Sequence, residues 1–418
     1  MTKRRLLISI SITIGSILVS GCAASTRQQE DLPVTAVPPI VRSHPQPTPT
    51  PLPTRPPRVT PTPVLFDQQQ YVAAPLRAGE VDDNERWQEY LQFRRSYRGP
   101  MVHDVDVSER YIITALDGND RPILDAAITV WDGQYRLWEA RTFATGQTLF
   151  FPRAFETSQA QDFTVTVNKE GIAYTFNLHR GQQETWVAKL EQFQRREQRV
   201  NLDVLFLLDS TGSMGDEIQA LQSSMHSIAR QIDHMRPRPD LHFGLVWYRD
   251  RGDRFVVRSA DFTHDVRDFS RQLDSVQAQG GGDYPESLNE ALHEALHEMS
   301  WRDDDTIRLI FLIADAPPHL DYWQDYDYAQ EMAVAAANGV KIFPIAASGA
   351  DDQAEYIFRQ LAQFTQGRYL FLTYEGPTNG GEPGDVSTMH VDGYGVQDLD
   401  DLVVRLVAEE LAHQTDGQ

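Results

Sequence analysis

The sequence predicts that the larger folded part of the chain is an α/β domain with a doubly wound, mostly parallel, Rossmann-like sheet, preceded by a small antiparallel β-sandwich and a disordered Pro-rich stalk. Beyond residue 200, apolar strands alternate with amphipathic helices, a pattern typical of a parallel sheet covered on both faces. Between residues 66 and 194, short segments alternate apolar and polar residues and are separated by turn residues. Residues 33–63 hold twelve of the 24 prolines and almost no large apolar residue.

The length of 418 residues suits two folded units with tails. We expect four segments, namely a signal peptide at 1–21, a Pro/Thr-rich linker at 22–65, a β-sandwich domain at 66–199 and the α/β domain at 200–418. Lys plus Arg number 38 against 60 Asp plus Glu, which gives a net charge of -22. This acidic balance argues against nucleic acid as a partner and favours metals or basic surfaces.

The N-terminus has the pattern of an export signal. Basic residues at 3–5 precede an apolar run at 6–19, which is short for a membrane span. Residues 18–22 read LVSGC and resemble a bacterial lipobox, which implies cleavage before Cys22 and acylation of its thiol. Cys22 is also the only cysteine, so no internal disulfide can form. We therefore expect an exported protein, lipid-anchored to the bacterial cell membrane and facing outside the cytoplasm; an ordinary signal peptide with a chance cysteine is the alternative.

The Pro-rich segment 33–63 is expected to form an extended stalk of about 3.1 Å per residue. After it, a polar helix is predicted around 85–94, followed by the strands of the sandwich. These strands are expected at 111–115, 127–131, 148–151, 163–167 and 173–176. Residues 117–133 resemble the start of carboxypeptidase regulatory-like modules, a resemblance that implies a spacer or protein-binding role.

The α/β part shows a regular succession of elements. Strands are predicted at 204–208, 243–247, 255–258, 307–314, 341–346 and 369–372. Helices are predicted at 214–235, 266–276, 286–299, 326–338, 354–364 and 399–413. Ligand sites of such folds lie at the carboxyl ends of the strands, which directs attention to the residues that follow each strand.

A metal-binding constellation follows two of these strands. The first strand ends in DSTGS, which places Asp209, Thr211 and Ser213 on a strand-to-helix turn. A second strand ends at Asp315, and a Gly-rich loop between the two carries Asp283. Carboxylate and hydroxyl oxygens are ligands for hard cations, so we expect Mg²⁺, or Mn²⁺ or Ca²⁺ in its place.

This combination resembles a von Willebrand factor type A domain with a metal-ion-dependent adhesion site. The family pattern D-x-S-x-S corresponds to Asp209, Thr211 and Ser213, its distal aspartate to Asp315, and its middle threonine to Asp283. The resemblance covers about residues 200–413 and implies that a carboxylate of a partner protein completes the shell of the cation. We therefore expect a binding protein rather than an enzyme, with an extracellular or envelope protein as its partner.

Two positions depart from the family pattern. Thr211 keeps the hydroxyl of the usual serine, whereas Asp283 adds a negative charge in place of a threonine and makes the cation less attractive to an acidic ligand. The alignment of this loop leaves Glu286 and Ser287 as alternatives for the group that faces the ion. Bordering residues Tyr284, His319, Tyr322 and Trp323 are predicted to form the rim of a ligand-binding surface, with ordinary loop packing as the alternative.

The segment HEALH, residues 293–297, matches the H-E-x-x-H pattern of zinc peptidases. On a helix, the apolar residues of 288–299 form one stripe that should face the sheet. His293 and His297 then lie roughly 120 to 160° from that stripe, toward solvent. No third ligand can be identified from the sequence. A zinc metallopeptidase is therefore kept as one alternative, and a surface scaffold that does not depend on a cation as another.

Overall fold

The structure, a computed structural model, describes residues 75–155, 159–195, 199–373, 389–391 and 393–415. The predicted signal peptide, the lipidation site Cys22, the Pro-rich linker and most of the Gly- and Asp-rich insertion at 375–397 lie outside these residues. The chain divides into two compact units, and all described residues belong to the second, Gln69–Gln418. Among them, no helix combines the length and apolar character that a membrane crossing requires.

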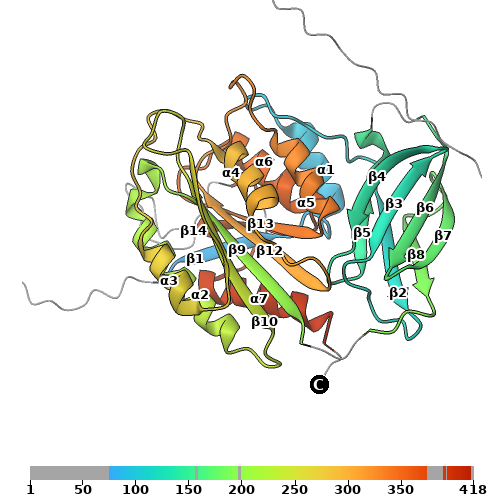
Figure 1. The fold of residues 1–418 in the computed structure, drawn as a ribbon. Coiled ribbons are helices and arrows are strands. Elements are labelled where there is room, and N and C mark those ends of the chain that lie inside the picture. The colour runs from blue at the N-terminus through green and yellow to red at the C-terminus, as the bar shows by residue number, and fades with distance from the viewer. Residues whose placement is uncertain (1–74, 156–158, 196–198, 374–388, 392, 416–418) are drawn as a thin grey trace, which may run out of the picture. The chain divides into compact units, whose positions relative to one another are not determined.

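The main sheet contains eight strands within the described residues (Figure 1). In spatial order these are β11 (Val257–Thr263), β10 (Asp240–Tyr248), β9 (Asn201–Asp209), β12 (Thr306–Ala314), β13 (Val340–Ala346), β14 (Tyr369–Thr373), β1 (Arg77–Val81) and β15 (Val396–Asp398). The five strands from β10 to β14 run parallel, and β11, β1 and β15 pair antiparallel to their neighbours. The predicted α/β class with a mostly parallel sheet is confirmed.

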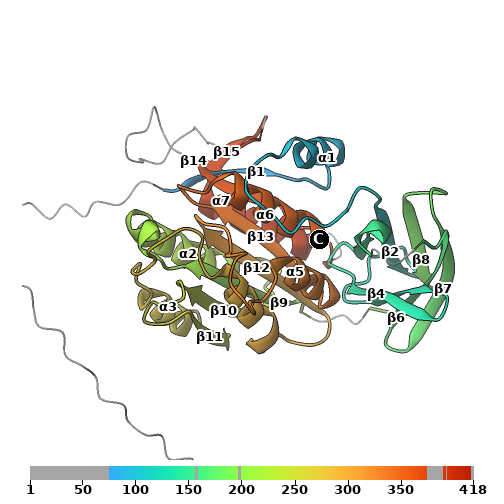
Figure 2. The same ribbon diagram turned by 90° about the horizontal axis from the view of Figure 1, so that it is seen from above.

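Helices cover both faces of this sheet (Figure 2). One face packs against α2 (Ile218–Asp233), α3 (Val266–Asp274) and α7 (Leu399–Ala412), and the other against α4 (Leu288–His293), α5 (Tyr328–Ala337) and α6 (Asp352–Phe364). Alternate residues of β9 enter the two cores, with Leu205 and Leu207 on one side and Phe206 on the other. Because both faces are covered, the strands read as continuous apolar runs, which is why the sequence predicted them well.

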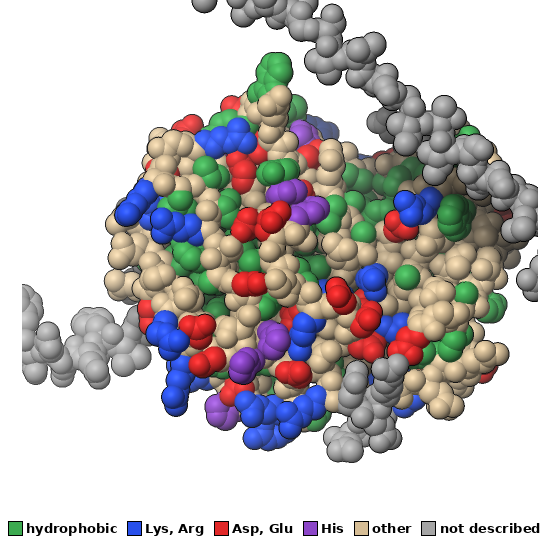
Figure 3. Space-filling view, viewed as in Figure 1, with side chains coloured by type: hydrophobic (Ala, Val, Ile, Leu, Met, Phe, Trp, Pro, Cys, Tyr) green, Lys and Arg blue, Asp and Glu red, His purple; other side chains and the backbone are tan. Residues whose placement is uncertain are grey.

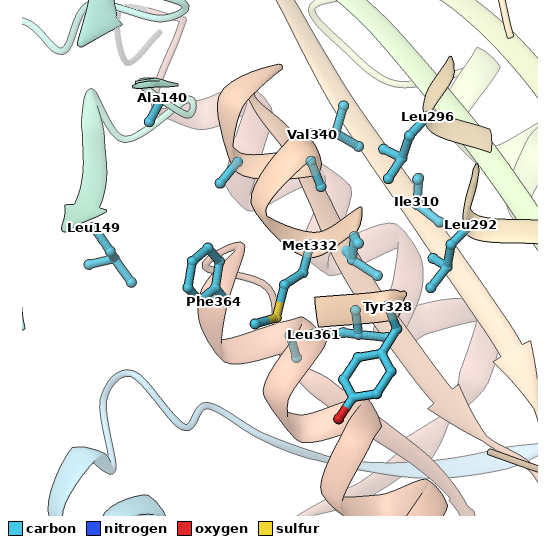
Figure 4. Close-up of a cluster of buried hydrophobic side chains, with 14 of the residues drawn as sticks. Ala140, Leu149, Leu292, Leu296, Ile310, Tyr328, Met332, Val340, Leu361 and Phe364 are labelled. Carbon is cyan, nitrogen blue, oxygen red and sulfur yellow. The ribbon is translucent and has the colours of Figure 1, made fainter. Parts of the chain in front are cut away.

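The core beneath α4 and α5 is drawn in Figure 4. Leu292 and Leu296 point toward Ile310 of β12, and Met332 of α5 lies beside Phe364 of α6. The helix predicted at 286–299 is α4 followed by a π-helical turn, η3 (Glu294–Glu298). Its apolar stripe faces the sheet as predicted.

The structure corrects one assignment near the start of the described chain. The segment 66–199 was expected to belong entirely to the sandwich, but β1 lies in the main sheet between β14 and β15. It pairs residues almost three hundred positions apart, and its sequence RAGEV gives no apolar alternation to reveal this. Gly79 is required there, because a Cβ would lie 2.5 Å from the Phe371 ring. The predicted polar helix is α1 (Trp87–Ser96), which buries Tyr90.

Residues 111–190 form two smaller sheets. One has the order β5 (Gln147–Phe150), β2 (Tyr111–Asp117), β8 (Thr185–Leu190), and the other β4 (Tyr135–Arg141), β3 (Ala127–Asp132), β6 (Asp162–Lys169), β7 (Ile172–His179). Phe150 of the first sheet meets Phe163 of the second edge-on, with ring centroids 5.1 Å apart. The expectation of purely antiparallel pairing is wrong for β2 and β8, which run parallel.

Two strands of these sheets, β4 and β8, escaped prediction. Both lie at the edge of a sheet, where charged side chains such as Arg136, Glu139 and Lys189 interrupt the apolar alternation. Two short 3-10 turns complete the described elements, η1 (Pro152–Ala154) and η2 (Gly212–Asp216).

The small sheets and the α/β part are joined by a buried ion pair. Asp125, with no exposed surface on its side chain, accepts from Nη1 of Arg308 on β12 at 3.0 Å. Arg141 approaches the same carboxylate oxygen at 3.1 Å. Trp138 of β4 meets Phe364 of α6 edge-on, with ring centroids 5.8 Å apart. The two parts therefore share a core and do not merely follow one another along the chain.

Candidate metal centre

Two aspartates come together because their strands are parallel neighbours. β9 ends at Asp209, and β12 ends one residue before Asp315. The register pairs Leu208 with Ile313, so both carboxylates lie at the same edge of the sheet. Both side chains are buried, with 0% and 4% of the surface of Asp209 and Asp315 exposed. This is the edge at which open α/β sheets bind their ligands.

The DSTGS turn gathers oxygen atoms around Asp209. Its Oδ1 accepts a hydrogen bond from the Thr211 amide at 2.8 Å and from Thr211 Oγ1 at 2.7 Å. Thr211 Oγ1 lies 3.0 Å from Ser213 Oγ. The second carboxylate oxygen of Asp209, Oδ2, is buried and has no hydrogen-bond partner among the described residues. A buried acceptor without a partner costs stability unless something else supplies a positive charge.

The glycine-rich loop brings Glu286 to this turn. The loop rests on the turn through a hydrogen bond from the Gly212 amide to the Gly280 carbonyl at 3.0 Å. A Cβ on Gly281 would lie 2.7 Å from Glu286 Oε1 and 3.2 Å from Thr211 Cβ, so glycine leaves the space in which these side chains approach. Glu286 is 3% exposed, and its Oε2 is buried without a hydrogen-bond partner among the described residues.

The electrostatics show how closely these acids are crowded. Burial, and then the neighbouring charge of Asp315, raise the pKa of Asp209 to about 7. Burial, and then the charges of Asp209 and Asp250, raise the pKa of Glu286 to about 9. Hydroxyl and carboxylate oxygens with this excess of negative charge fit a hard divalent cation.

The structure groups Asp283, predicted to complete the site, with a different set of side chains. Its side chain is exposed, and its carboxylate groups with Asp250 and His319, whose ligand atoms all lie within 4.8 Å of one another. The structure therefore favours Glu286, the alternative considered for this loop, over Asp283. The reason is local: the chain turns so that residue 286 faces the sheet edge while residue 283 faces outward. Ser287, the other alternative, donates to Asp250 Oδ1 at 2.9 Å instead.

Asp250 is a functional candidate that the sequence analysis missed. It follows β10 by two residues, is 4% exposed, and accepts a hydrogen bond from the Tyr322 hydroxyl at 2.9 Å. The rule that pointed to Asp209 and Asp315, a carboxylate just after a parallel strand, would also have identified it.

The four predicted rim residues fall into two groups. Trp323 is 84% exposed and Tyr284 is 46% exposed. By contrast, His319 is buried and stacks on the half-buried Tyr322, with ring centroids 3.8 Å apart. In Figure 3 apolar side chains protrude at the top of the view, on the loop between β12 and α5. Trp323 and Tyr284 thus provide exposed aromatic surface, while His319 and Tyr322 support the loop from within.

Part of the chain is similar in sequence to known proteins. Residues 203–373 match the family model described as von Willebrand factor A domain, which confirms the predicted domain type. The α-protein kinase vwkA of Dictyostelium discoideum is 29% identical over 146 residues, covering 34% of this chain and 22% of the kinase. The human von Willebrand factor A domain-containing protein 7 is 34% identical over 113 residues, covering 27% and 12%. The chain thus spans less than a quarter of the length of either relative.

Several solved structures are similar in fold. BatB from Bacteroides thetaiotaomicron aligns with a TM-score of 0.35 and 15% identity, covering 50% of this chain and 99% of that one. Proximal thread matrix protein 1 from the mussel byssus, solved with a zinc-occupied MIDAS motif, aligns with a TM-score of 0.34 and 12% identity, covering 52% and 48%.

Proposed function

Because residues 203–373 carry a von Willebrand factor A domain, we propose that this protein binds a divalent cation at the DSTGS turn and uses this domain to bind a partner protein outside the cytoplasm. Mg²⁺ is the proposed cation, with Mn²⁺ or Ca²⁺ in its place. The observation that carries the proposal is the buried Oδ2 of Asp209, which has no hydrogen-bond partner among the described residues and lies on the turn that holds Thr211 and Ser213. A cation there would give this oxygen its missing partner.

The proposed ligands are Asp209, Thr211, Ser213 and Asp315, joined by Glu286. Their oxygen atoms suit an octahedral ion that keeps some water. When ionised, three carboxylates around one divalent ion leave a net charge of about -1, which weakens the attraction of the ion for an acidic side chain of a partner. The proposal therefore separates into two parts, cation binding and recognition of the partner through the cation.

We propose binding rather than catalysis. The Thr211 hydroxyl donates to Asp209 Oδ1 and lies 3.0 Å from the Ser213 hydroxyl, and no described histidine hydrogen-bonds to either hydroxyl, so no imidazole among the described residues is placed to activate them as nucleophiles. The LVSGC segment further supports an anchor at Cys22. Labelling with a radioactive fatty acid tests that anchor: wild type should take up the label and Cys22→Ala should not, and label in both or in neither would contradict it.

The binding proposal is tested by capture of proteins from envelope extract with the full chain as bait. We expect a protein that is retained in Mg²⁺ and lost in EDTA, and lost in both with Asp209→Ala. Asp268→Ala, which removes an exposed carboxylate of α3, is the matched control and should behave as wild type. A partner retained equally in Mg²⁺ and in EDTA would overturn recognition through the cation and support the alternative of a cation-independent scaffold.

A further inference from the structure

The sequence predicted that the HEALH histidines point toward solvent. In the structure both also contact a buried carboxylate. His293 Nδ1 lies 2.9 Å from Glu331 Oε1, and His297 Nε2 lies 2.9 Å from Glu331 Oε2. Glu331 belongs to α5, which packs beside α4. The helical periodicity of residues 288–299 indicates which side faces the sheet but carries no information on a neighbouring helix, and α5 covers this side of α4. Figure 3 shows histidine and acidic side chains together at the surface between the positions of α4 and α5.

Stacked aromatic rings hold the histidines of this cluster in place. The rings of His293 and His297 stack with centroids 4.2 Å apart, and Tyr326 stacks on His293 at 3.6 Å. The chain from Glu294 to Glu298 forms a π-helical turn, a distortion that is frequent at functional sites. Glu331 is 5% exposed, whereas the histidine side chains are 25% and 36% exposed, so the cluster has a buried floor and an open side.

A peptidase would need Glu294, the glutamate of the motif, close to the metal as a general base. In H-E-x-x-H peptidases the glutamate of the motif acts on the metal-bound water. Here Glu294 Oε1 accepts a hydrogen bond from Ser259 Oγ of β11 at 2.6 Å, and is held there rather than beside Glu331. The cluster therefore offers metal ligands without the group that would make it hydrolytic.

We propose that His293, His297 and Glu331 form a second metal site, specific for a transition metal ion of the zinc class, which joins α4 to α5. Two imidazoles and one carboxylate are a common ligand set for Zn²⁺, with water in the fourth position. One ligand atom from each of the three residues lies within 4.8 Å of the other two. Tetrahedral bonds of about 2.0–2.1 Å separate ligand atoms by about 3.3 Å, so the two 2.9 Å contacts need to open by a few tenths of an ångström, and any pair near the 4.8 Å limit needs to close.

This site is chemically distinct from the DSTGS turn and does not rest on the proposed function. The turn offers oxygen atoms alone, which suit Mg²⁺, whereas imidazole nitrogen selects transition metals. The ion would take the place of the proton between Glu331 and each of the two facing imidazole nitrogens, and its positive charge would offset that of the buried carboxylate. It would fix α4, whose first residue Leu288 follows Glu286 by two positions.

The experiment uses the full chain, stripped of metal and then titrated with Co²⁺ in excess Mg²⁺. We expect one equivalent of Co²⁺ with the intense visible absorption of a four-coordinate site, in wild type and in Asp209→Ala alike. His297→Gln should bind Co²⁺ at least ~100-fold more weakly, since loss of a direct ligand exceeds the 10–100-fold effect of losing an outer partner. His264→Gln, which changes an exposed histidine of the same domain, should match wild type.

Two results would overturn the proposal. Wild type without the four-coordinate spectrum, or His297→Gln with an unchanged one, would mean that the three residues form a hydrogen-bonded cluster only. Should His297→Gln fail to fold, X-ray absorption of zinc-loaded wild type decides without a variant. Two imidazole ligands are expected there, and a shell of oxygen atoms alone would contradict the site.

Discussion

Burial governs the chemistry of single residues at the sheet edge. Burial and the charges of neighbouring carboxylates oppose the ionisation of Asp209 and Glu286. These two effects raise their pKa values to about 7 and about 9. A group whose pKa is higher in the folded than in the unfolded state favours folding when protonated, and this contribution is lost as pH rises. Without a cation, the folded protein therefore carries an electrostatic cost at neutral pH that a divalent ion would remove.

This cost leads to a prediction on pH. In EDTA the midpoint of thermal unfolding should fall as pH rises from about 4 to about 9, the interval bounded by the unfolded and folded pKa values of these two acids. Saturating Mg²⁺ should flatten this dependence. Glu286→Gln should flatten the upper part of it in EDTA. A flat profile in EDTA for wild type would contradict the crowding of carboxylates at this edge.

A second prediction distinguishes two residues of one loop. Glu286→Gln should weaken Mg²⁺ binding by at least about tenfold, because it alters a group at the DSTGS turn. Asp283→Asn, an equally conservative change three residues away, should leave the affinity unchanged, since Asp283 is exposed beside Asp250. Titration calorimetry, or Mn²⁺ resonance with Mg²⁺ as competitor, measures both. The reverse ranking would restore the assignment first drawn from the sequence.

Helices and strands could be predicted from the sequence where the pattern of a short segment alone identifies them. Strands β9 and β12 are buried along almost their whole length, so their apolar runs were recognisable, and so was the rule that ligands follow strand ends. Which acid of the loop at 280–287 turns inward was not recognisable, because backbone conformation decides it. The Glu331 partner of HEALH was hidden for another reason, since it lies on a different helix 34 residues beyond His297.

The position of β1 depends on a glycine that lies against a buried ring. Gly79→Ala should destabilise the folded chain by about 1–3 kcal/mol, because its methyl group would lie 2.5 Å from the buried Phe371 ring. Gly395→Ala is the control, since a Cβ there meets no atom within 4 Å. Urea denaturation of both variants measures the difference. Equal stabilities would mean that the Phe371 ring moves aside without cost and that glycine is not required at position 79.

At the scale of the molecule, the ion pair between Asp125 and Arg308 unites parts that the sequence treated as separate domains. Both side chains are almost completely buried, and 183 residues separate them in the chain. No local pattern predicts such a pairing, because each residue reads as an ordinary charged position near a turn or strand. The same holds for β1, whose partners in β14 lie at the other end of the chain.

Breaking this pair should destabilise the whole unit. Asp125→Ala leaves Arg308 buried without its carboxylate, a change that costs about 3–5 kcal/mol. The double variant Asp125→Ala, Arg308→Met should recover part of that loss, because it removes the uncompensated charge as well. Chemical denaturation followed by fluorescence and by circular dichroism measures both variants. A single variant as stable as wild type would show that the two parts do not depend on each other here.

The position of β1 also determines how the domain would respond to mechanical tension. Arg77 pairs with Thr373 at the same sheet edge as Asp209, four strand spacings or about 19 Å away. A pull between Arg77 and a partner held at Asp209 acts across the strands, along their hydrogen bonds. It reaches the Arg77 end of the ladder first, so these bonds open one after another instead of sharing the force. A domain loaded in this way would open the ladder between β1 and β14 before the central parallel strands are strained.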